Sequence, residues 1–200
     1  MSTSKTFDGP SRFFRKFRIA LFALLVVSTL AAVEKAFSAE QLWSEIGNGG
    51  IVLFRHALAP GTGDPEEFDL ADCSTQRNLD DRGRERARAI GAAFRSRGIK
   101  VGKVLTSQWC RCRETADLAF PGKVTEAPVF NSFFETRSAG PDQTRATLDL
   151  LEAWSGPGAL VVVTHQVNIT ALTGVFPSSG EGIVIRIEDA APTTVGRLNI

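Results

Sequence analysis

Two continuous apolar runs, the first ended by the charged Arg55 and each followed by a histidine, dominate the hydrophobic pattern of the chain. The first covers residues 50–55 and precedes His56, and the second covers 159–164 and precedes His165. Runs of this length without polar alternation are typical of strands that are buried on both faces of a parallel sheet. Because ligands bind at the carboxyl ends of such strands, we expect both histidines at one edge of the sheet.

Segments with helical periodicity lie between the apolar runs. A helix is expected from Asp80 or Asp81 to Gly98, because Ala87, Ile90 and Phe94 fall on one of its faces. The other expected elements are a strand at 103–106, an extended segment at 124–130, helices at 108–119, 141–154 and from 168, and closing strands at 182–187 and 194–200 with a turn at 191–192. This alternation predicts an α/β fold, a three-layer α/β/α sandwich with a mostly parallel central sheet.

The first 39 residues have the order of a secretory signal. Four basic residues at 12–18 directly precede a 15-residue apolar run at 19–33, and small residues follow at 36–39, where cleavage after Ser38 or Ala39 fits equally well. The run is shorter than the roughly 20 residues that span a bilayer as a helix, which favours a cleaved signal over a retained N-terminal membrane anchor. No twin-arginine pair is present, so a Sec-type signal and a periplasmic or secreted location are expected.

The remaining residues, 40–200, have the size of one catalytic domain. Removing residues 1–39 takes away six basic and two acidic residues and leaves 17 basic and 20 acidic ones, a net charge of −3. A nucleic-acid binder would need a surplus of basic residues, so that class is disfavoured. Membrane contact is expected only through the N-terminal segment if it stays uncleaved, and the oligomeric state is left open.

All three cysteines lie in the predicted exported part. A single disulfide is expected from Cys73 to either Cys110 or Cys112, which would tie the long aperiodic loop at 57–77 to a helix. A zinc site is disfavoured because the cysteines lack a CxxC spacing and the chain has only two histidines. No metal and no cofactor are therefore expected.

The residues around the two histidines suit phosphate chemistry. A neutral imidazole is a nucleophile near pH 7, and Arg55 beside His56 would lower its pKa and attract a phosphate dianion. Arg111 is four residues from both Ser107 and Thr115, so its guanidinium can point from a helix toward the strand ends and grip two phosphate oxygens. A protonated His165 would donate a hydrogen bond to the same group.

Four segments in order resemble motifs of the histidine phosphatase (phosphoglycerate mutase-like) superfamily. Residues 53–57 are similar to its Arg-His-Gly signature, and 163–165 to its second histidine motif. Residues 78–87 resemble its Leu-Thr-x-x-Gly-x-x-Gln-Ala segment, and 106–116 its Ser-x-x-x-Arg-Ala-x-x-Thr-Ala segment. The resemblance implies a phosphoglycerate mutase-like fold for residues 40–200, a phosphohistidine on His56, and a phosphoryl group held by Arg55, Arg111 and His165.

The chain departs from the family pattern at three positions. Ala57 replaces a glycine, Cys112 an alanine, and Gln166 stands where the phytase-like branch carries the acid that protonates the leaving group. Glu135 occupies about the place where the mutase-like branch has its glutamate, so it is the first candidate for the general acid. Asp64, in the long loop and also a candidate substrate-binding residue, is the second.

The resulting expectation is a metal-independent phosphomonoester hydrolase of the histidine acid phosphatase type. Its substrate is expected to be a small-molecule or glycan phosphate ester outside the cytoplasm, because some exported bacterial members of the family act on lipopolysaccharide-core sugar phosphates. A phosphomutase is a second hypothesis, and a phosphate- or phosphoglycan-binding module that does not turn over is a third.

Overall fold

The computed structural model describes residues 39–200, and the strands of its sheet and the helices that cover it lie within the unit Leu42–Ile200. Residues 1–38, which hold nearly all of the predicted secretory signal, lie outside the described residues. Among the helices that are described, none combines the length and the apolar character that a membrane crossing requires.

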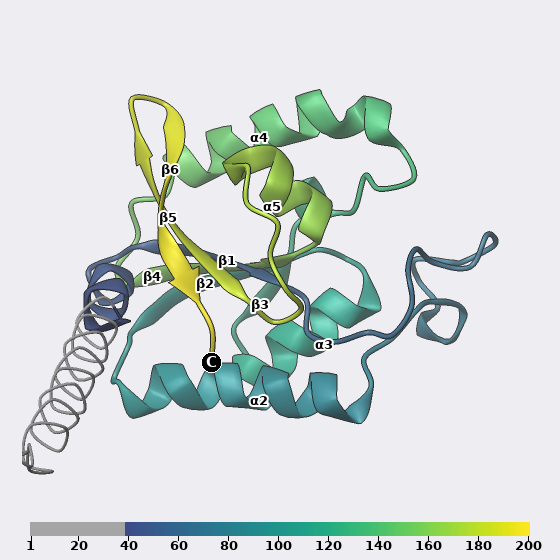
Figure 1. The fold of residues 1–200 in the computed structure, drawn as a ribbon, viewed down its shortest axis with the longest axis horizontal. Helices are drawn as coiled ribbons and strands as arrows, with labels where there is room; N and C mark the ends of the chain where they lie inside the picture. Colours follow the sequence, from purple (N-terminus) through teal and green to yellow (C-terminus); the bar gives the residue numbers. More distant parts are fainter. Residues whose placement is uncertain (1–38) are drawn as a thin grey trace, which may run out of the picture. The chain divides into compact units, whose positions relative to one another are not determined.

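A six-stranded sheet in the order β3–β2–β4–β1–β5–β6 forms the centre of the unit (Figure 1). Four strands are parallel to one another: β1 (Ile51–Arg55), β2 (Val101–Thr106), β3 (Val124–Glu126) and β4 (Ala159–Thr164). The last two, β5 (Gly182–Glu188) and β6 (Ala191–Leu198), continue the sheet in antiparallel orientation. The mostly parallel sheet is confirmed.

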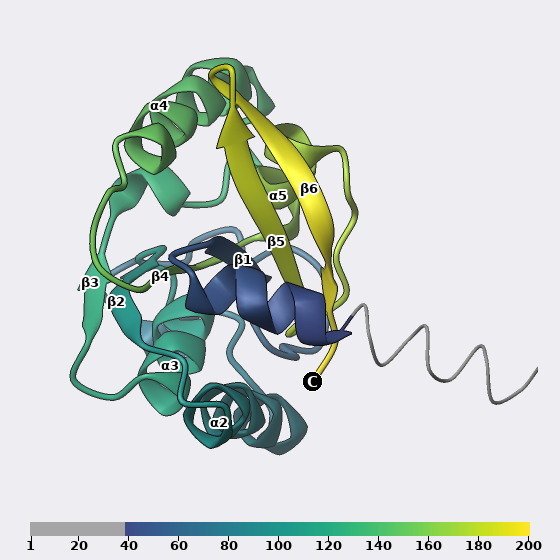
Figure 2. The ribbon, with the colours of Figure 1, turned by 90° about the vertical axis from the view of Figure 1, so that its left-hand side faces the viewer.

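Helices cover both faces of this sheet, and Figure 2 shows them as separate layers. The labelled helices are α2 (Asp81–Ser96), α3 (Cys110–Ala119), α4 (Gly140–Glu152) and α5 (Gln166–Thr173), and residues 39–47 are also helical. Short 3-10 turns lie at η1 (Cys73–Thr75), η2 (Pro128–Phe130) and η3 (Arg137–Ala139). The helices α2 and α3 pack on one face and α4 and α5 on the other, which confirms the three-layer α/β/α architecture.

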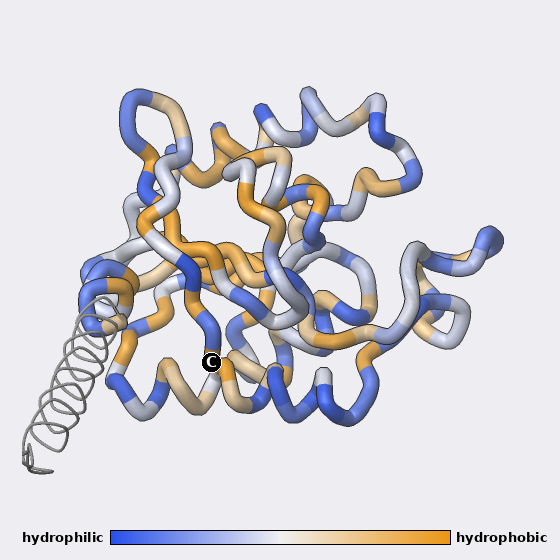
Figure 3. Tube along the Cα trace, in the orientation of Figure 1, coloured by the Kyte–Doolittle hydropathy of each residue, from blue (hydrophilic) through white to orange (hydrophobic). Residues whose placement is uncertain are grey.

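The two faces of the sheet have separate hydrophobic cores because strand side chains alternate in direction. Val52 and Phe54 of β1 point toward α2 and α3, whereas Ile51 and Leu53 point toward the opposite core with Ile169 of α5. Both sets are buried, which explains why the sequences of β1 and β4 are continuous apolar runs. Figure 3 shows the most hydrophobic stretches gathered along these central strands.

The predicted turn at 191–192 is wrong by two residues. β5 and β6 are joined by Asp189 and Ala190, which both have positive φ (51° and 58°), as a two-residue hairpin loop requires. Pro192 instead lies in β6 opposite Ile187. Proline is tolerated there because β6 is an edge strand, where a missing N–H costs little. Asp189 can adopt the left-handed conformation more readily than most residues, and the proline misdirected the prediction.

The start of α2 fixes the chain segment that follows His56. The Asp80 side chain accepts a hydrogen bond from the Gly83 N–H at 2.7 Å, as a helix N-cap does, and the Asp80 N–H donates to the Leu58 carbonyl. A Cβ on Gly83 would lie 2.2 Å from that carbonyl oxygen. The absence of a side chain at Gly83 therefore lets α2 pack directly on the backbone two residues beyond the histidine.

Candidate functional site

A cavity of about 240 Å³ opens at the carboxyl ends of β1 and β4. All six candidate site residues from the sequence line it: Arg55, His56, Asp64, Arg111, Glu135 and His165. They come from two strand ends, one helix and two loops. The topology of the sheet accounts for the meeting of the two histidines, since β1 and β4 are parallel neighbours.

His56 is buried with one nitrogen tied to the backbone and the other facing a guanidinium. Its Nδ1 lies 2.8 Å from the Ala57 carbonyl oxygen, which can only accept, so Nδ1 carries the proton. Nε2 is then the unprotonated nitrogen, and Arg111 Nε donates to it at 3.2 Å. Burial, then the charge of Arg111, hold the pKa of His56 well below its usual value. The ring is therefore neutral at pH 7 with Nε2 free to act as a nucleophile.

His165 is held in the opposite tautomer. Its Nε2 lies 2.8 Å from Ser107 Oγ, and that hydroxyl donates its own proton to Asn131 Oδ1 at 3.2 Å, so Nε2 is the donor. The free Nδ1 faces Arg111 Nη2 at 3.5 Å, and the His56 and His165 rings are 5.6 Å apart. Burial, followed by the charge of Arg111, lowers the pKa of His165 well below its usual value.

The spacing of Ser107, Arg111 and Thr115 brings all three to the histidines. Ser107 contacts His165 and Arg111 contacts both rings, whereas Thr115 Oγ1 accepts from the Ala57 N–H at 3.0 Å and donates to the Arg111 carbonyl at 2.7 Å. Ser107 lies just before α3 and the other two lie in its first turns. These three side chains, on one face of the segment, thus hold the end of β1 and the nucleophile His56 that follows it.

Arg55 lies beside the nucleophile at the end of β1. Its Nη1 donates to the Pro177 carbonyl at 3.1 Å, and its buried Nε has no hydrogen-bond partner among residues 39–200. Burial and the nearby Arg111 lower the pKa of Arg55. A buried guanidinium donor without a protein acceptor in an arginine-lined cavity is suited to an anionic ligand.

Arg77 is a cavity residue that the sequence reasoning missed. Its Nε donates to the Gly63 carbonyl at 2.7 Å, and its Nη1 donates to the Ala59 carbonyl. Burial and the charge of Arg111 lower its pKa, so a third guanidinium lies close to the site. Its position at the end of an aperiodic loop carried no periodic signal, and only its place three residues before the N-cap of α2 could have drawn attention to it.

The two candidate acids have different surroundings. Asp64 is bound end-on by Arg111 at 2.7 and 2.9 Å and also accepts from the Trp109 indole N–H at 2.9 Å. Burial alone would raise the pKa of Asp64, but the hydrogen bond and charge of Arg111 outweigh it and lower the pKa. Glu135 is exposed at the mouth, with its Oε1 3.3 Å from the place a Gly63 Cβ would take.

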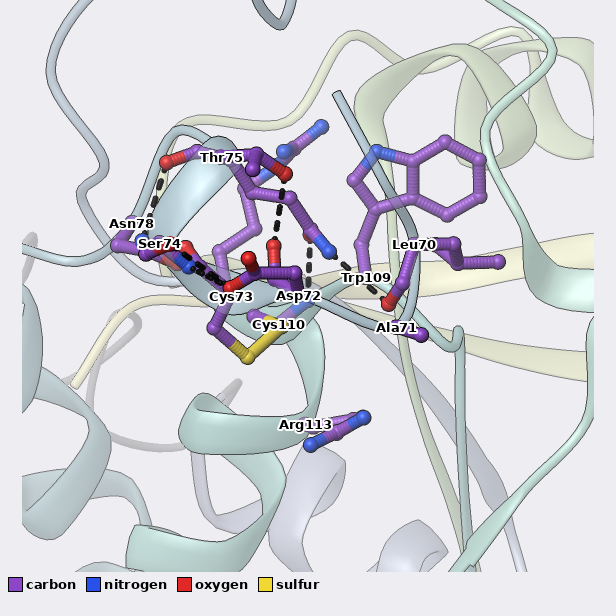
Figure 4. The surroundings of a disulfide bond; sticks show 12 residues. Leu70, Ala71, Asp72, Cys73, Ser74, Thr75, Asn78, Trp109, Cys110 and Arg113 are labelled. Carbon is purple, nitrogen blue, oxygen red and sulfur yellow. Dashed lines mark hydrogen bonds between the residues drawn. A yellow bond between two sulfur atoms is a disulfide. The ribbon is translucent and has the colours of Figure 1, made fainter. Parts of the chain in front are cut away.

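The long loop is fastened to the start of α3 by a disulfide and a buried glutamine. Cys73 pairs with Cys110, and the surroundings of this bond appear in Figure 4. Gln76 accepts from the Cys110 N–H at 3.0 Å and donates to the carbonyls of Asp69 and Leu70. Of the two pairings left open by the sequence, the structure has the one to Cys110.

Cys112 is the remaining thiol, and it is buried 3.5 Å from His165 Nε2. Burial raises its pKa to about 12. At neutral pH it is therefore a protonated, unreactive side chain that fills space behind the histidine.

Part of the chain is similar to a known sequence family. The sequence model of the histidine phosphatase superfamily (branch 1) matches residues 51–135, a range that includes Arg55, His56, Asp64, Arg111 and Glu135. Serine/threonine-protein phosphatase Pgam5, mitochondrial, of Drosophila virilis is 38% identical over 68 residues. That match covers 34% of this chain and 21% of the relative, so it spans about a fifth of the length of the curated protein.

Solved structures share the fold over most of the chain. A phosphoserine phosphatase from Entamoeba histolytica in complex with 3-phosphoglyceric acid has a TM-score of 0.55 at 12% identity, covering 76% of this chain and 98% of that one. An alpha-ribazole phosphatase from Shigella flexneri has a TM-score of 0.51 at 16% identity, covering 72% and 94%. At these identities the likeness concerns the fold.

Proposed function

We propose that the chain is a metal-independent phosphomonoester hydrolase of the histidine phosphatase superfamily, whose sequence model matches residues 51–135, and that it works through a phosphohistidine on His56. One observation carries the proposal. The unprotonated Nε2 of a buried, neutral His56 faces a cavity in which Arg55 and Arg111 converge, so a nucleophile and an anion site coincide.

In the first step His56 Nε2 attacks phosphorus as the bond from phosphorus to the leaving oxygen breaks. Arg55 and Arg111 neutralise the non-bridging oxygens, and His165, once it binds a proton on Nδ1, donates to one of them. Phosphoryl transfer depends mainly on such positioning and charge neutralisation. The buried nucleophile needs no deprotonation because its Nε2 is already free.

We assign the proton that the leaving oxygen receives to Glu135. This carboxyl group lies at the mouth of the cavity, where the leaving alcohol would emerge, and it forms no ion pair with an arginine among residues 39–200. In the second step water attacks phosphorus, the Glu135 carboxylate accepts its proton, and the bond from phosphorus to His56 breaks. Phosphate leaves and the neutral histidine is restored.

We propose a phosphorylated sugar or glycan outside the cytoplasm as the substrate. The cavity mouth combines aromatic rings of Phe68, Trp109 and Phe134 with polar groups of Ser132 and Thr136, a mixture that suits a sugar ring and its hydroxyls. Two features support export through a Sec-type signal. The N-terminal segment has the order of a secretory signal, and the disulfide is a bond that persists in oxidising compartments.

Phosphate release from para-nitrophenyl phosphate in the presence of EDTA tests the proposed function. The wild-type protein should turn over, and His56→Ala should lose about a thousandfold or more of that rate. Arg113→Ala is the matched control, because Arg113 pairs with Glu126 away from the cavity. Acid-labile labelling by a 32P-phosphorylated substrate should appear in the wild type and not in His56→Ala.

Other outcomes separate the alternatives. Equal rates for wild type and His56→Ala would sink the hydrolase proposal. Phosphate binding without turnover would identify a phosphate-binding module. Transfer of the label to an added alcohol or sugar in place of water would identify a phosphomutase.

A further inference from the structure

Arg111 has two usable edges, and each faces a different partner. The end edge, formed by Nη1 and Nη2, is held by both oxygens of Asp64 at 2.7 and 2.9 Å. The side edge, formed by Nε and the second Nη2 hydrogen, points at the free nitrogens of His56 and His165 at 3.2 and 3.5 Å. The remaining Nη1 hydrogen faces the Arg77 carbonyl at 3.5 Å. All five N–H groups of the guanidinium are thereby oriented.

The contacts on the two edges differ in strength. Those to Asp64 are short, charge-assisted and buried, with side-chain exposures of 3% for Arg111 and 8% for Asp64. Those to the imidazoles are longer and link a cation to neutral rings. A phosphoryl oxygen arriving at His56 would therefore replace the imidazole contacts on the side edge and leave the end edge in place.

Asp64 is itself fixed from the far side. The Trp109 indole N–H donates to one oxygen at 2.9 Å, and the Arg77 backbone N–H donates to the other at 3.2 Å. Four donors thus hold this carboxylate, and Trp109 is the N-cap residue of α3, the helix that carries Arg111. The loop that carries Asp64 and the helix α3 thus together fix the position of the Arg111 guanidinium.

We propose that Asp64 is a positioning residue that keeps the side edge of Arg111 turned toward the phosphoryl group on His56 throughout turnover. This inference rests on the proposed function of the site. It assigns Asp64 a role different from a general acid, since an acid must release its proton to the leaving oxygen, whereas this carboxylate is bound by four donors. The proposed role also means that phosphate does not have to displace Asp64 from Arg111, because the two bind different edges of the guanidinium.

Leaving-group dependence separates these roles. The variant is Asp64→Asn, which keeps the size but removes the charge, and the matched control is Glu67→Gln on the exposed part of the same loop. Para-nitrophenolate leaves without a proton, whereas the alkoxide of glycerol 2-phosphate needs one. For a positioning residue, kcat/KM should fall by about a hundredfold, and by the same factor, on both substrates. Inhibition by inorganic phosphate should weaken as well, while Glu67→Gln stays like the wild type.

Two results would overturn the inference. A loss confined to glycerol 2-phosphate would make Asp64 the general acid, and tighter inhibition by phosphate in Asp64→Asn would make it a competitor. Thermal melting checks that the variant folds, and Asp64→Glu, which keeps the charge but shifts it, should show the same substrate-independent loss if Asp64→Asn does not fold. Failure of the proposed function is distinct, because the wild type would then match His56→Ala.

Discussion

At the scale of single residues, the site is a pair of neutral imidazoles that share one guanidinium. His56 donates from Nδ1 and His165 donates from Nε2, so their unprotonated nitrogens both face Arg111. Adding a proton to either ring would set a second positive charge against that arginine. Protonation of either histidine is therefore unfavourable in the folded protein, and only an anion bound in the cavity would offset the added charge.

This penalty predicts that stability falls as the pH drops below about 6.5. In the unfolded chain both histidines bind protons near pH 6.5, whereas in the folded chain their lowered pKa values keep them neutral to lower pH. The unfolded state then binds more protons, so the free energy of unfolding decreases on acidification. The slope approaches about 2.7 kcal/mol per pH unit for two protons, and it ends once the folded histidines also titrate.

Urea unfolding at pH 7.5, 6.5 and 5.5 measures this dependence. The variant His165→Asn, with one of the two groups removed, should show about half the slope. Asp64, Glu45 and Glu181 have lowered pKa values and so titrate below this pH range, whereas burial raises the pKa of Asp117. A free energy of unfolding that stays constant between pH 7.5 and 5.5 would contradict the argument.

Residue chemistry also sets how much of the site could be predicted. The two histidines and Arg111 followed from strand ends and helical spacing, because these depend on local periodicity. The ion pair of Asp64 with Arg111 did not, since it depends on how a loop without periodicity folds back over 47 positions. The contribution of Arg77 was missed for the same reason.

At the scale of elements, burial decided which strands could be predicted from the sequence. Residues of β1 and β4 are buried on both faces, so their apolar runs marked them to within one residue. The exposed edge strand β6 begins three residues before the predicted start, because its alternating polar residues and Pro192 resemble a turn. A short β3 followed by the 3-10 turn η2 likewise replaced one extended segment.

The loop at 57–77 and α3 behave as one element through the Cys73–Cys110 bond. The bond closes a loop with a sequence separation of 37, for which chain entropy gives a stabilisation of about 3–4 kcal/mol. We expect Cys73→Ser/Cys110→Ser to lose about that much in urea unfolding and to have a higher KM for para-nitrophenyl phosphate. Wild-type protein with the bond reduced should match the double variant. An unchanged unfolding midpoint would show that the hydrogen bonds of Gln76 suffice.

At the scale of the whole molecule, the site needs both halves of the sequence. The family match ends at residue 135, yet His165 and the carbonyl of Pro177 lie beyond it. Glu181 fixes the segment around Pro177 by accepting from the Ser178 N–H and from Arg197 on β6. The β5–β6 hairpin therefore holds the segment around Pro177, and the Pro177 carbonyl accepts a hydrogen bond from Arg55.

The disulfide and the N-terminal segment together predict where the protein acts. A bond between Cys73 and Cys110 would be reduced in most cytoplasms, and the apolar run at 19–33 would carry the chain out of that compartment. Residues 1–39 should direct a reporter enzyme that is active only after export. Leu25→Arg should abolish the reporter signal, because a charge in the apolar run opposes insertion, whereas Leu25→Ile should preserve it. The exported protein, denatured and alkylated without reduction, should react at Cys112 alone. Three reactive thiols, together with a reporter signal unchanged by Leu25→Arg, would place the enzyme in the cytoplasm.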